Sequence, residues 1–227
     1  TMFITNNKNN ENYPVSNIFS RPDIKLTNNN SNPTISNLSN SDKTVDSDVS
    51  NSLKRSMKVF LAENPNIPTE ILSKLALSPD DFVRQYVASN PSTPKEVLTA
   101  LSHDKNSYVL SAIAENTSTP SSVLRELGNS DRKDIRNSVG RNTSTPVDVL
   151  TSFAQLDDKH LKASVAGNES ITDDVRGLLS FDSDPFVRQM VALNEKTPLN
   201  ILERLATDSD KNVRHSVAKS KATPPAL

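Results

Sequence analysis

Apolar positions recur in two alternating sets along residues 53–227. The first set is spaced i, i+1, i+4, which is typical of one face of a short helix. It comprises Ile71, Val97, Val123, Val149, Val175 and Ile201; Leu72, Leu98, Leu124, Leu150 and Leu202; and Leu75, Leu101, Leu127, Phe153, Leu179 and Leu205. The second set is spaced four apart and comprises Val83, Val109, Ile135, Leu161, Val187 and Val213, then Val87, Ile113, Val139, Val165, Val191 and Val217. The pattern therefore predicts two short helices in every unit.

An asparagine repeats every 26 residues and sets the length of the unit. It stands at Asn64, Asn90, Asn116, Asn142, Asn168 and Asn194, and Ser220 holds the seventh position. Self-similarity at a fixed period of this size is the signature of a solenoid, in which each unit packs on its neighbours. We therefore predict an all-α solenoid of 26-residue repeats.

Turn residues indicate where the helices start and end. Threonine and proline precede most first helices, as at Thr93 and Pro94, which predicts a threonine N-cap and a proline at the first helical position. The first helix is short enough to be partly 3₁₀. The repeated asparagine follows the second helix, where we expect it to adopt the left-handed conformation that ends helices.

The segment from Val83 to Pro94, followed by Leu98 and Leu101, resembles the leucine-rich repeat variant family. Its units read approximately Val-Arg-x-x-Val-Ala-x-Asn-Pro-x-Thr-Pro-x-x-x-Leu-x-x-Leu. The resemblance covers residues 53–227 and implies a right-handed, HEAT-like superhelix of alternating α and 3₁₀ helices. It implies no shared catalytic activity. Some members hold an iron–sulfur centre on cysteines, but this chain has no cysteine, so we expect no cofactor.

Residues 1–52 differ in character, since they hold 13 asparagines and little apolar periodicity. Such composition is typical of a disordered tail. The locally apolar segment 13–19 can instead dock as an extended peptide, with the tail packed in the groove of the solenoid. At the other end, Leu227 matches Ile201 of the previous unit, so we expect a C-terminal cap or a further domain beyond it.

Charge and hydropathy narrow the function classes. The net charge is −1, and residues 53–227 carry 22 basic and 22 acidic side chains, without the basic excess that non-specific nucleic-acid binding favours. The chain shows neither a membrane span nor a signal peptide, so we expect a cytoplasmic protein without a membrane partner.

One column of the second helices is basic, which raises the question of an anion site. It contains Lys58, Arg84, Arg136, Lys162, Arg188 and Arg214, and is interrupted by Leu110. Acids stand four residues before most of these bases, at Asp80, Asp158, Asp184 and Asp210, which favours a structural ladder of i, i+4 ion pairs. Arg132 replaces the acid before Arg136, so we single out Arg132, Lys133, Arg136 and Arg141 as an unpaired cluster for anion or nucleic-acid binding.

An aromatic column precedes the core valine at Phe82, Tyr108 and Phe186. Tyr86 and Met190 stand one turn further on. This spacing is typical of the margin of the core. The alternative is a patch of Phe82, Tyr86 and Tyr108 that docks a partner, because aromatic residues are enriched at interface anchors.

The fifth unit is irregular, and the chain shows little sign of catalytic chemistry. Ile171, Thr172 and Arg176 replace the cap, the proline and the leucine, and Gly177 follows, which indicates drift or a bend. The three histidines, His103, His160 and His215, occupy different columns and have no metal spacing.

The sequence therefore favours a non-enzymatic interaction module that presents a solenoid surface to a protein or peptide. One alternative is DNA or RNA binding through the basic column. Another is a regulatory or targeting arm of a larger enzyme.

Overall fold

The computed structural model describes the backbone of residues 40–223 and the side chains of residues 51–223. Residues 44–227 belong to one compact unit. The predicted docking segment 13–19 and the terminal Leu227 lie outside the described residues.

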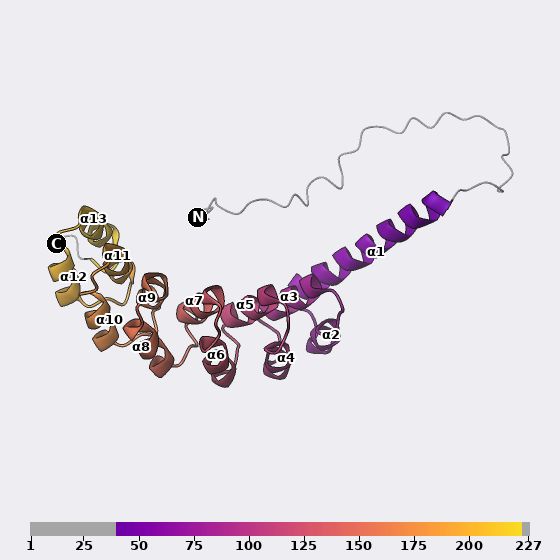
Figure 1. The fold of residues 1–227 in the computed structure, drawn as a ribbon, viewed down its shortest axis with the longest axis horizontal. Helices are drawn as coiled ribbons and strands as arrows, with labels where there is room; N and C mark the ends of the chain where they lie inside the picture. The colour runs from indigo at the N-terminus through magenta and orange to yellow at the C-terminus, as the bar shows by residue number, and fades with distance from the viewer. Residues whose placement is uncertain (1–39, 224–227) are drawn as a thin grey trace, which may run out of the picture. The chain divides into compact units, whose positions relative to one another are not determined.

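Helices follow one another with short connections throughout residues 40–223, where no strand occurs (Figure 1). They are α1 (Asn40–Glu63), α2 (Thr69–Leu75), α3 (Asp81–Ser89), α4 (Lys95–Leu101), α5 (Ser107–Glu115), α6 (Ser121–Gly128), α7 (Lys133–Arg141), α8 (Val147–Gln155), α9 (Lys159–Ala166), α10 (Asp173–Leu179), α11 (Pro185–Leu193), α12 (Leu199–Leu205) and α13 (Lys211–Lys219). The predicted all-α solenoid of paired short helices is confirmed.

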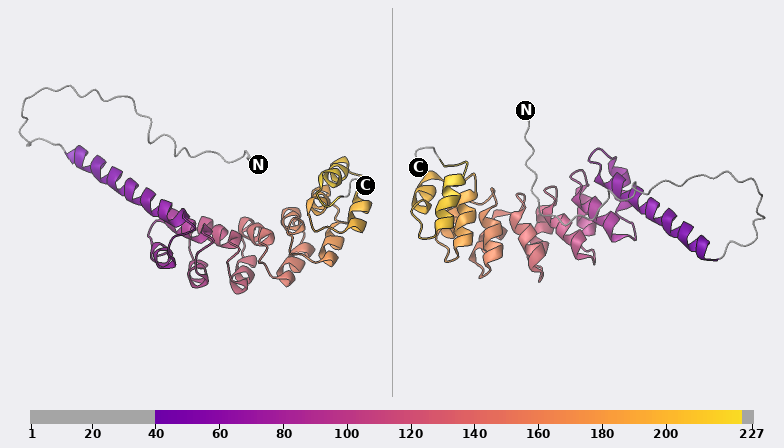
Figure 2. Two further views of the ribbon diagram at one scale, coloured as in Figure 1. Left: turned by 180° about the vertical axis from the view of Figure 1, so that it is seen from behind. Right: turned by 90° about the horizontal axis from the view of Figure 1, so that it is seen from above.

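The helices are arranged in two rows. The first helices of the units (α2, α4, α6, α8, α10 and α12) form one row, and the second helices (α3, α5, α7, α9, α11 and α13) form the other (Figures 1 and 2). Each second helix packs on the second helix of the next unit. Residues 40–52, which the composition assigned to the tail, lie in helix α1. The first helices could be α or partly 3₁₀, and every helix of residues 40–223 is α, unlike the alternating α and 3₁₀ helices that the family resemblance implies.

The core lies between the two rows and is built from the predicted apolar columns. The leucine column is fully buried at Leu72, Leu98, Leu124, Leu150 and Leu202. Alanine or glycine follows the second valine column, and Ala88, Ala114, Ala166 and Ala192 are completely buried. These small residues let neighbouring second helices approach closely.

The repeated asparagine joins units, and its predicted left-handed conformation is wrong. Asn90 has φ −72° and ψ 125°, and no residue of the described chain has a positive φ. Its side-chain amide donates to the carbonyls of Ala62 (2.6 Å) and Asn64 (2.9 Å) in the preceding unit. Its Oδ1 accepts from the Ser92 amide at 2.8 Å. The same pair of bonds to the preceding unit recurs at Asn116, Asn142, Asn168 and Asn194.

The threonine before the proline is not an N-cap, and the proline lies just outside the helix. Helix α4 begins at Lys95 after Pro94, which makes no side-chain capping bond. The Thr93 hydroxyl instead donates to the carbonyl of Val87 at 2.5 Å, at the end of the preceding second helix. The predicted cap is therefore shifted by one residue, because the threonine satisfies an orphan carbonyl of α3 rather than an amide of α4.

Candidate interaction surface

The second helices carry the charged and aromatic columns that the sequence singled out, so this row is the candidate surface. Five of the six second helices begin at an acid or an amide that caps them, whereas α7 begins after Arg132, which makes no side-chain capping bond. Asp80, Asn106, Asp158, Asp184 and Asp210 accept backbone hydrogen bonds from the first turn. These acids are the ones that the sequence paired with the basic column.

The basic column does not form the predicted i, i+4 ladder. Arg84 pairs with Asp104 of the next unit, through Nε to Oδ2 at 2.6 Å and Nη2 to Oδ1 at 3.1 Å. Arg188 makes the same two-point contact with Asp208 at 2.8 and 2.9 Å, and Lys162 reaches Asp182 at 2.8 Å. These three bases thus join their units to the following ones, because the acid four residues earlier is occupied with capping its helix.

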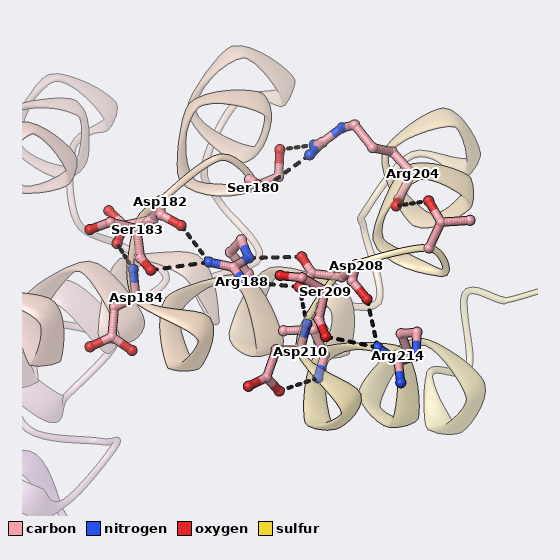
Figure 3. A network of polar contacts seen from close by, with 12 residues as sticks. Ser180, Asp182, Ser183, Asp184, Arg188, Arg204, Asp208, Ser209, Asp210 and Arg214 are labelled. Atoms are coloured by element: carbon pink, nitrogen blue, oxygen red, sulfur yellow. Dashed lines mark hydrogen bonds and ion pairs between the residues drawn. The ribbon is translucent and has the colours of Figure 1, made fainter.

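Arg84 and Arg188 also donate hydrogen bonds from Nη1 to backbone carbonyls. Arg188 Nη1 donates to the carbonyls of Asp182 (2.7 Å) and Ser183 (3.2 Å), as Figure 3 shows. The hydrogen bond from Arg188 lowers the pKa of Asp208, and that from Arg84 lowers the pKa of Asp104. The guanidinium groups are therefore fixed between units and have few donors left for a partner.

Arg136 lacks the inter-unit acid that Arg84, Lys162 and Arg188 bind. It donates to the carbonyl of Ser130 at 2.5 Å, as its counterparts do to theirs. The acid partners Asp104, Asp182 and Asp208 each stand twenty residues after their base. Leu156, which is 47% exposed, stands twenty residues after Arg136. The described residues therefore give Arg136 no carboxylate partner.

The other three members of the predicted anion cluster do have carboxylate partners. Arg132 pairs with Asp134 at 2.8 Å, Lys133 with Asp158 at 3.6 Å and Arg141 with Glu115 at 3.3 Å. The premise that the cluster is unpaired is therefore wrong for these three residues. All three cations remain at least half exposed.

The aromatic column lies on the exposed side of the row. Phe82 is 53% exposed and Tyr108 is 69% exposed, whereas Tyr86 is half-buried and packs against the core. The guanidinium of Arg55 covers the Phe82 ring at 4.3 Å from its centroid. Phe186 continues the column on α11 and meets the His160 ring edge-on, with centroids 6.5 Å apart.

A groove opens over helix α9, and sequence reasoning missed it. It has a volume of about 520 Å³ and is lined by Asn137 and Arg141 from α7, His160, Ala163, Ser164 and Gly167 from α9, and Phe186 and Met190 from α11. The signal that could have found it is the small size of two α9 residues. Ala163 and Gly167 stand in columns where α11 carries Gln189 and Leu193.

The irregular fifth unit keeps its place in the first row. Thr172, which replaces the proline, accepts a hydrogen bond from the Val175 amide at 3.4 Å and so caps α10. Arg176 takes the leucine position and is buried, donating to Asp173 and to the carbonyl of Glu169, both at 2.8 Å. The Arg204 guanidinium lies 3.7 Å from the centroid of the Phe181 ring.

The described residues contain no group of three or more histidine, aspartate or glutamate side chains arranged to hold a metal ion. None of their helices is both long and apolar enough to cross a membrane.

One unit matches a known family directly. The profile of the leucine rich repeat variant family matches residues 81–106, which run from the start of α3 to the start of α5. Residues 81–106 are a leucine rich repeat variant unit. The resemblance on which the sequence prediction relied is thereby confirmed, and this unit contains Phe82, Tyr86 and Arg84.

Solved structures with similar arrangements include a leucine-rich repeat variant. A protein described as "A leucine-rich repeat variant with a novel repetitive protein structural motif" is 27% identical with a TM-score of 0.49, and the match covers 67% of this chain and 61% of that chain. This chain thus spans less than two thirds of that relative. An engineered protein is 16% identical with a TM-score of 0.41, over 66% of this chain and 96% of that chain. A comparison with curated proteins found no match.

Proposed function

We propose that this leucine rich repeat variant array is a non-enzymatic interaction module that binds a protein or peptide along its second helices. The observation that carries the proposal is the set of exposed aromatic rings on three of the second helices. Phe82 and Tyr108 lie on neighbouring helices, and Phe186 extends the column on α11.

Exposed aromatic side chains favour a protein partner for energetic reasons. Large, rigid rings bury much apolar area with little loss of conformational entropy, so they are enriched among the residues that dominate binding energy. Packed helices lie about 8–10 Å apart, so Phe82 and Tyr108 offer contacts at a spacing that an extended or helical peptide can span.

The charged residues of the same row support a protein rather than a nucleic acid. Arg84, Lys162 and Arg188 hold acids of the next unit, so these cations are already neutralised. Binding of a phosphate backbone requires several cations free to replace counterions. Arg136 on α7 and Arg214 on α13 donate only to backbone carbonyls in this column, but they do not lie on neighbouring helices.

The proposal is tested by selecting peptides from a phage-displayed random library on the whole chain. The affinity of a selected, fluorescently labelled peptide is then measured by anisotropy. We expect the double variant Phe82→Ser, Tyr108→Ser to lose at least about tenfold in affinity, as anchor residues do. The control is Leu178→Ser, because Leu178 is 51% exposed, close to the 53% of Phe82, but lies in the other row of helices.

Two results would count against the proposal. One is the absence of any peptide whose binding depends on the second-helix row. The other is salt-sensitive binding of duplex or single-stranded DNA that Arg132→Ala with Arg136→Ala abolishes, which would favour the nucleic-acid alternative.

A further inference from the structure

The groove over α9 differs from the aromatic patch on α3 and α5 because its two walls have different chemistry. One wall is α7, where Asn137 and Arg141 line the groove and Lys133, four residues before Asn137, shares their helix face. The opposite wall is α11, where Phe186 and Met190 are also four apart. A cationic, polar wall thus faces an apolar one.

The floor of the groove is formed by α9, and two small residues of this helix make the groove deep. Ala163 and Gly167 each have an equivalent position in the other second helices, 26 residues apart along the chain. Among helices α3 to α13, α9 has the smallest pair of residues at these two positions. A Cβ added to Gly167 would lie 3.1 Å from Cε of Met190, so the glycine leaves the space that the methionine borders. A ligand side chain can enter where other units place Gln85 or Gln189.

The cations of the polar wall can turn toward a ligand. The Arg141–Glu115 pair is 3.3 Å long, and its side chains are 54% and 59% exposed. Lys133 is 76% exposed and lies 3.6 Å from Asp158. Exposed pairs of this kind hold their partners weakly, so a carboxylate in the groove competes for Arg141 at little cost.

From this arrangement we infer that the α9 groove is the anchor site for an acidic peptide segment. One aromatic or long apolar side chain of the segment enters between Phe186 and Met190 and the floor at Ala163, while a carboxylate pairs with Arg141. The inference rests on the proposed function and adds the chemistry of the partner. Charge complementarity and the apolar wall together favour such a peptide over nucleic acid, whose phosphates would have only the α7 wall to bind.

The test fills the groove with a side chain that the array already tolerates. Ala163→Gln introduces the residue found at the same position of the unit in Gln85 and Gln189. Peptides are selected from the random phage library on the whole chain after depletion on the Ala163→Gln variant, so that only binders sensitive to the groove remain. The matched control is Ser111→Gln, in the same column of α5.

We expect the enriched peptides to share a carboxylate and an aromatic or long apolar residue. A synthetic peptide of that sequence loses about tenfold or more in affinity on Ala163→Gln and on Arg141→Gln, and keeps its affinity for Ser111→Gln. Thermal unfolding of each variant verifies that the array is folded.

The inference is overturned if depletion leaves no enriched peptide, if the enriched peptides lack an acid, or if Arg141→Gln leaves the affinity unchanged. A second selection, without depletion on the Ala163→Gln variant, distinguishes failure of the groove inference from failure of the proposed function. Peptides that bind only through Phe82 and Tyr108 would retain the proposed function and reject the groove. The absence of any binder in both selections would reject both.

Discussion

Asn116 shows how one amide side chain joins two units. Its Nδ2 donates to the carbonyls of Ala88 (2.8 Å) and Asn90 (2.9 Å), and its Oδ1 accepts from the Ser118 amide at 2.9 Å. All of these groups lie where water has little access, so the side chain satisfies carbonyls that would otherwise be buried without a donor.

We predict that Asn116→Ala lowers the free energy of unfolding by about 2–4 kcal/mol, because two hydrogen bonds are lost and two buried carbonyls stay unsatisfied. Urea unfolding followed by circular dichroism measures the loss. Asn64→Ala is the control, because Asn64 is exposed and its Oδ1 bonds the Asn66 amide; we expect a loss below about 1 kcal/mol. Equal losses at the two positions would contradict the role of the inter-unit bonds.

The sequence predicts that the repeated asparagine and threonine have structural roles, but it does not predict which hydrogen bonds they make. The period of Asn90 and Thr93 is visible in the sequence, and so is their position between two helices. Local rules then assign Asn90 to a left-handed turn and Thr93 to an N-cap. Both rules consider only neighbours in the chain, whereas the bonds of Asn90 go to residues 26 and 28 positions earlier.

At the scale of elements, the junction of α7 with the next unit lacks the ion pair that Arg84 and Arg188 form at their junctions. Arg84 and Arg188 each bind the acid twenty positions later, but Leu156 stands in that position for Arg136. In the other units this acid also accepts the amide hydrogen bond that leads into the second helix, as Asp104 does from Asn106 at 2.8 Å.

We predict that Leu156→Asp stabilises the array by about 1 kcal/mol, because it supplies both the missing partner of Arg136 and the missing turn acceptor. An increase of about 2–4 °C in the melting temperature is expected for a chain of this length. Leu156→Ser is the control, since the serines of this column, such as Ser130, accept the turn hydrogen bond but form no ion pair. The prediction fails if the aspartate is no more stabilising than the serine.

The sequence marks this junction as irregular, but its cause is visible only once the pairing distance of twenty residues is known. Arg136 stands out in the sequence because Arg132 replaces the usual acid. That acid turns out to be a helix cap, and the true partner is the residue twenty positions further on, in the next unit. The groove over α9 was missed for a related reason, since it depends on the relative sizes of neighbouring side chains on α7, α9 and α11.

At the scale of the described unit, the ion pairs between repeats make stability depend on pH. The pKa values of Asp104 and Asp208 lie below the ordinary value of 3.8 because of their hydrogen bonds with Arg84 and Arg188. The unfolded chain therefore binds these protons more tightly than the folded chain. The stabilisation is complete well above pH 3.8 and is lost as the pH falls through the lowered folded-state pKa.

We predict that the free energy of unfolding of the wild type falls as the pH decreases below about 5, and that it falls less steeply in the double variant Arg84→Gln, Arg188→Gln. The double variant is also less stable at neutral pH. Urea unfolding at a series of pH values measures both effects. Arg214→Gln is the control, because Arg214 donates to the carbonyls of Asp208 and Ser209, and its pH dependence should match that of the wild type.

The backward direction of the asparagine bonds has a consequence for synthesis on the ribosome. Ala88 and Asn90 acquire their amide donor only when Asn116 has been made. A newly emerged unit therefore remains incomplete until the next one has left the exit tunnel. The array consolidates from its N-terminal side, one unit behind translation.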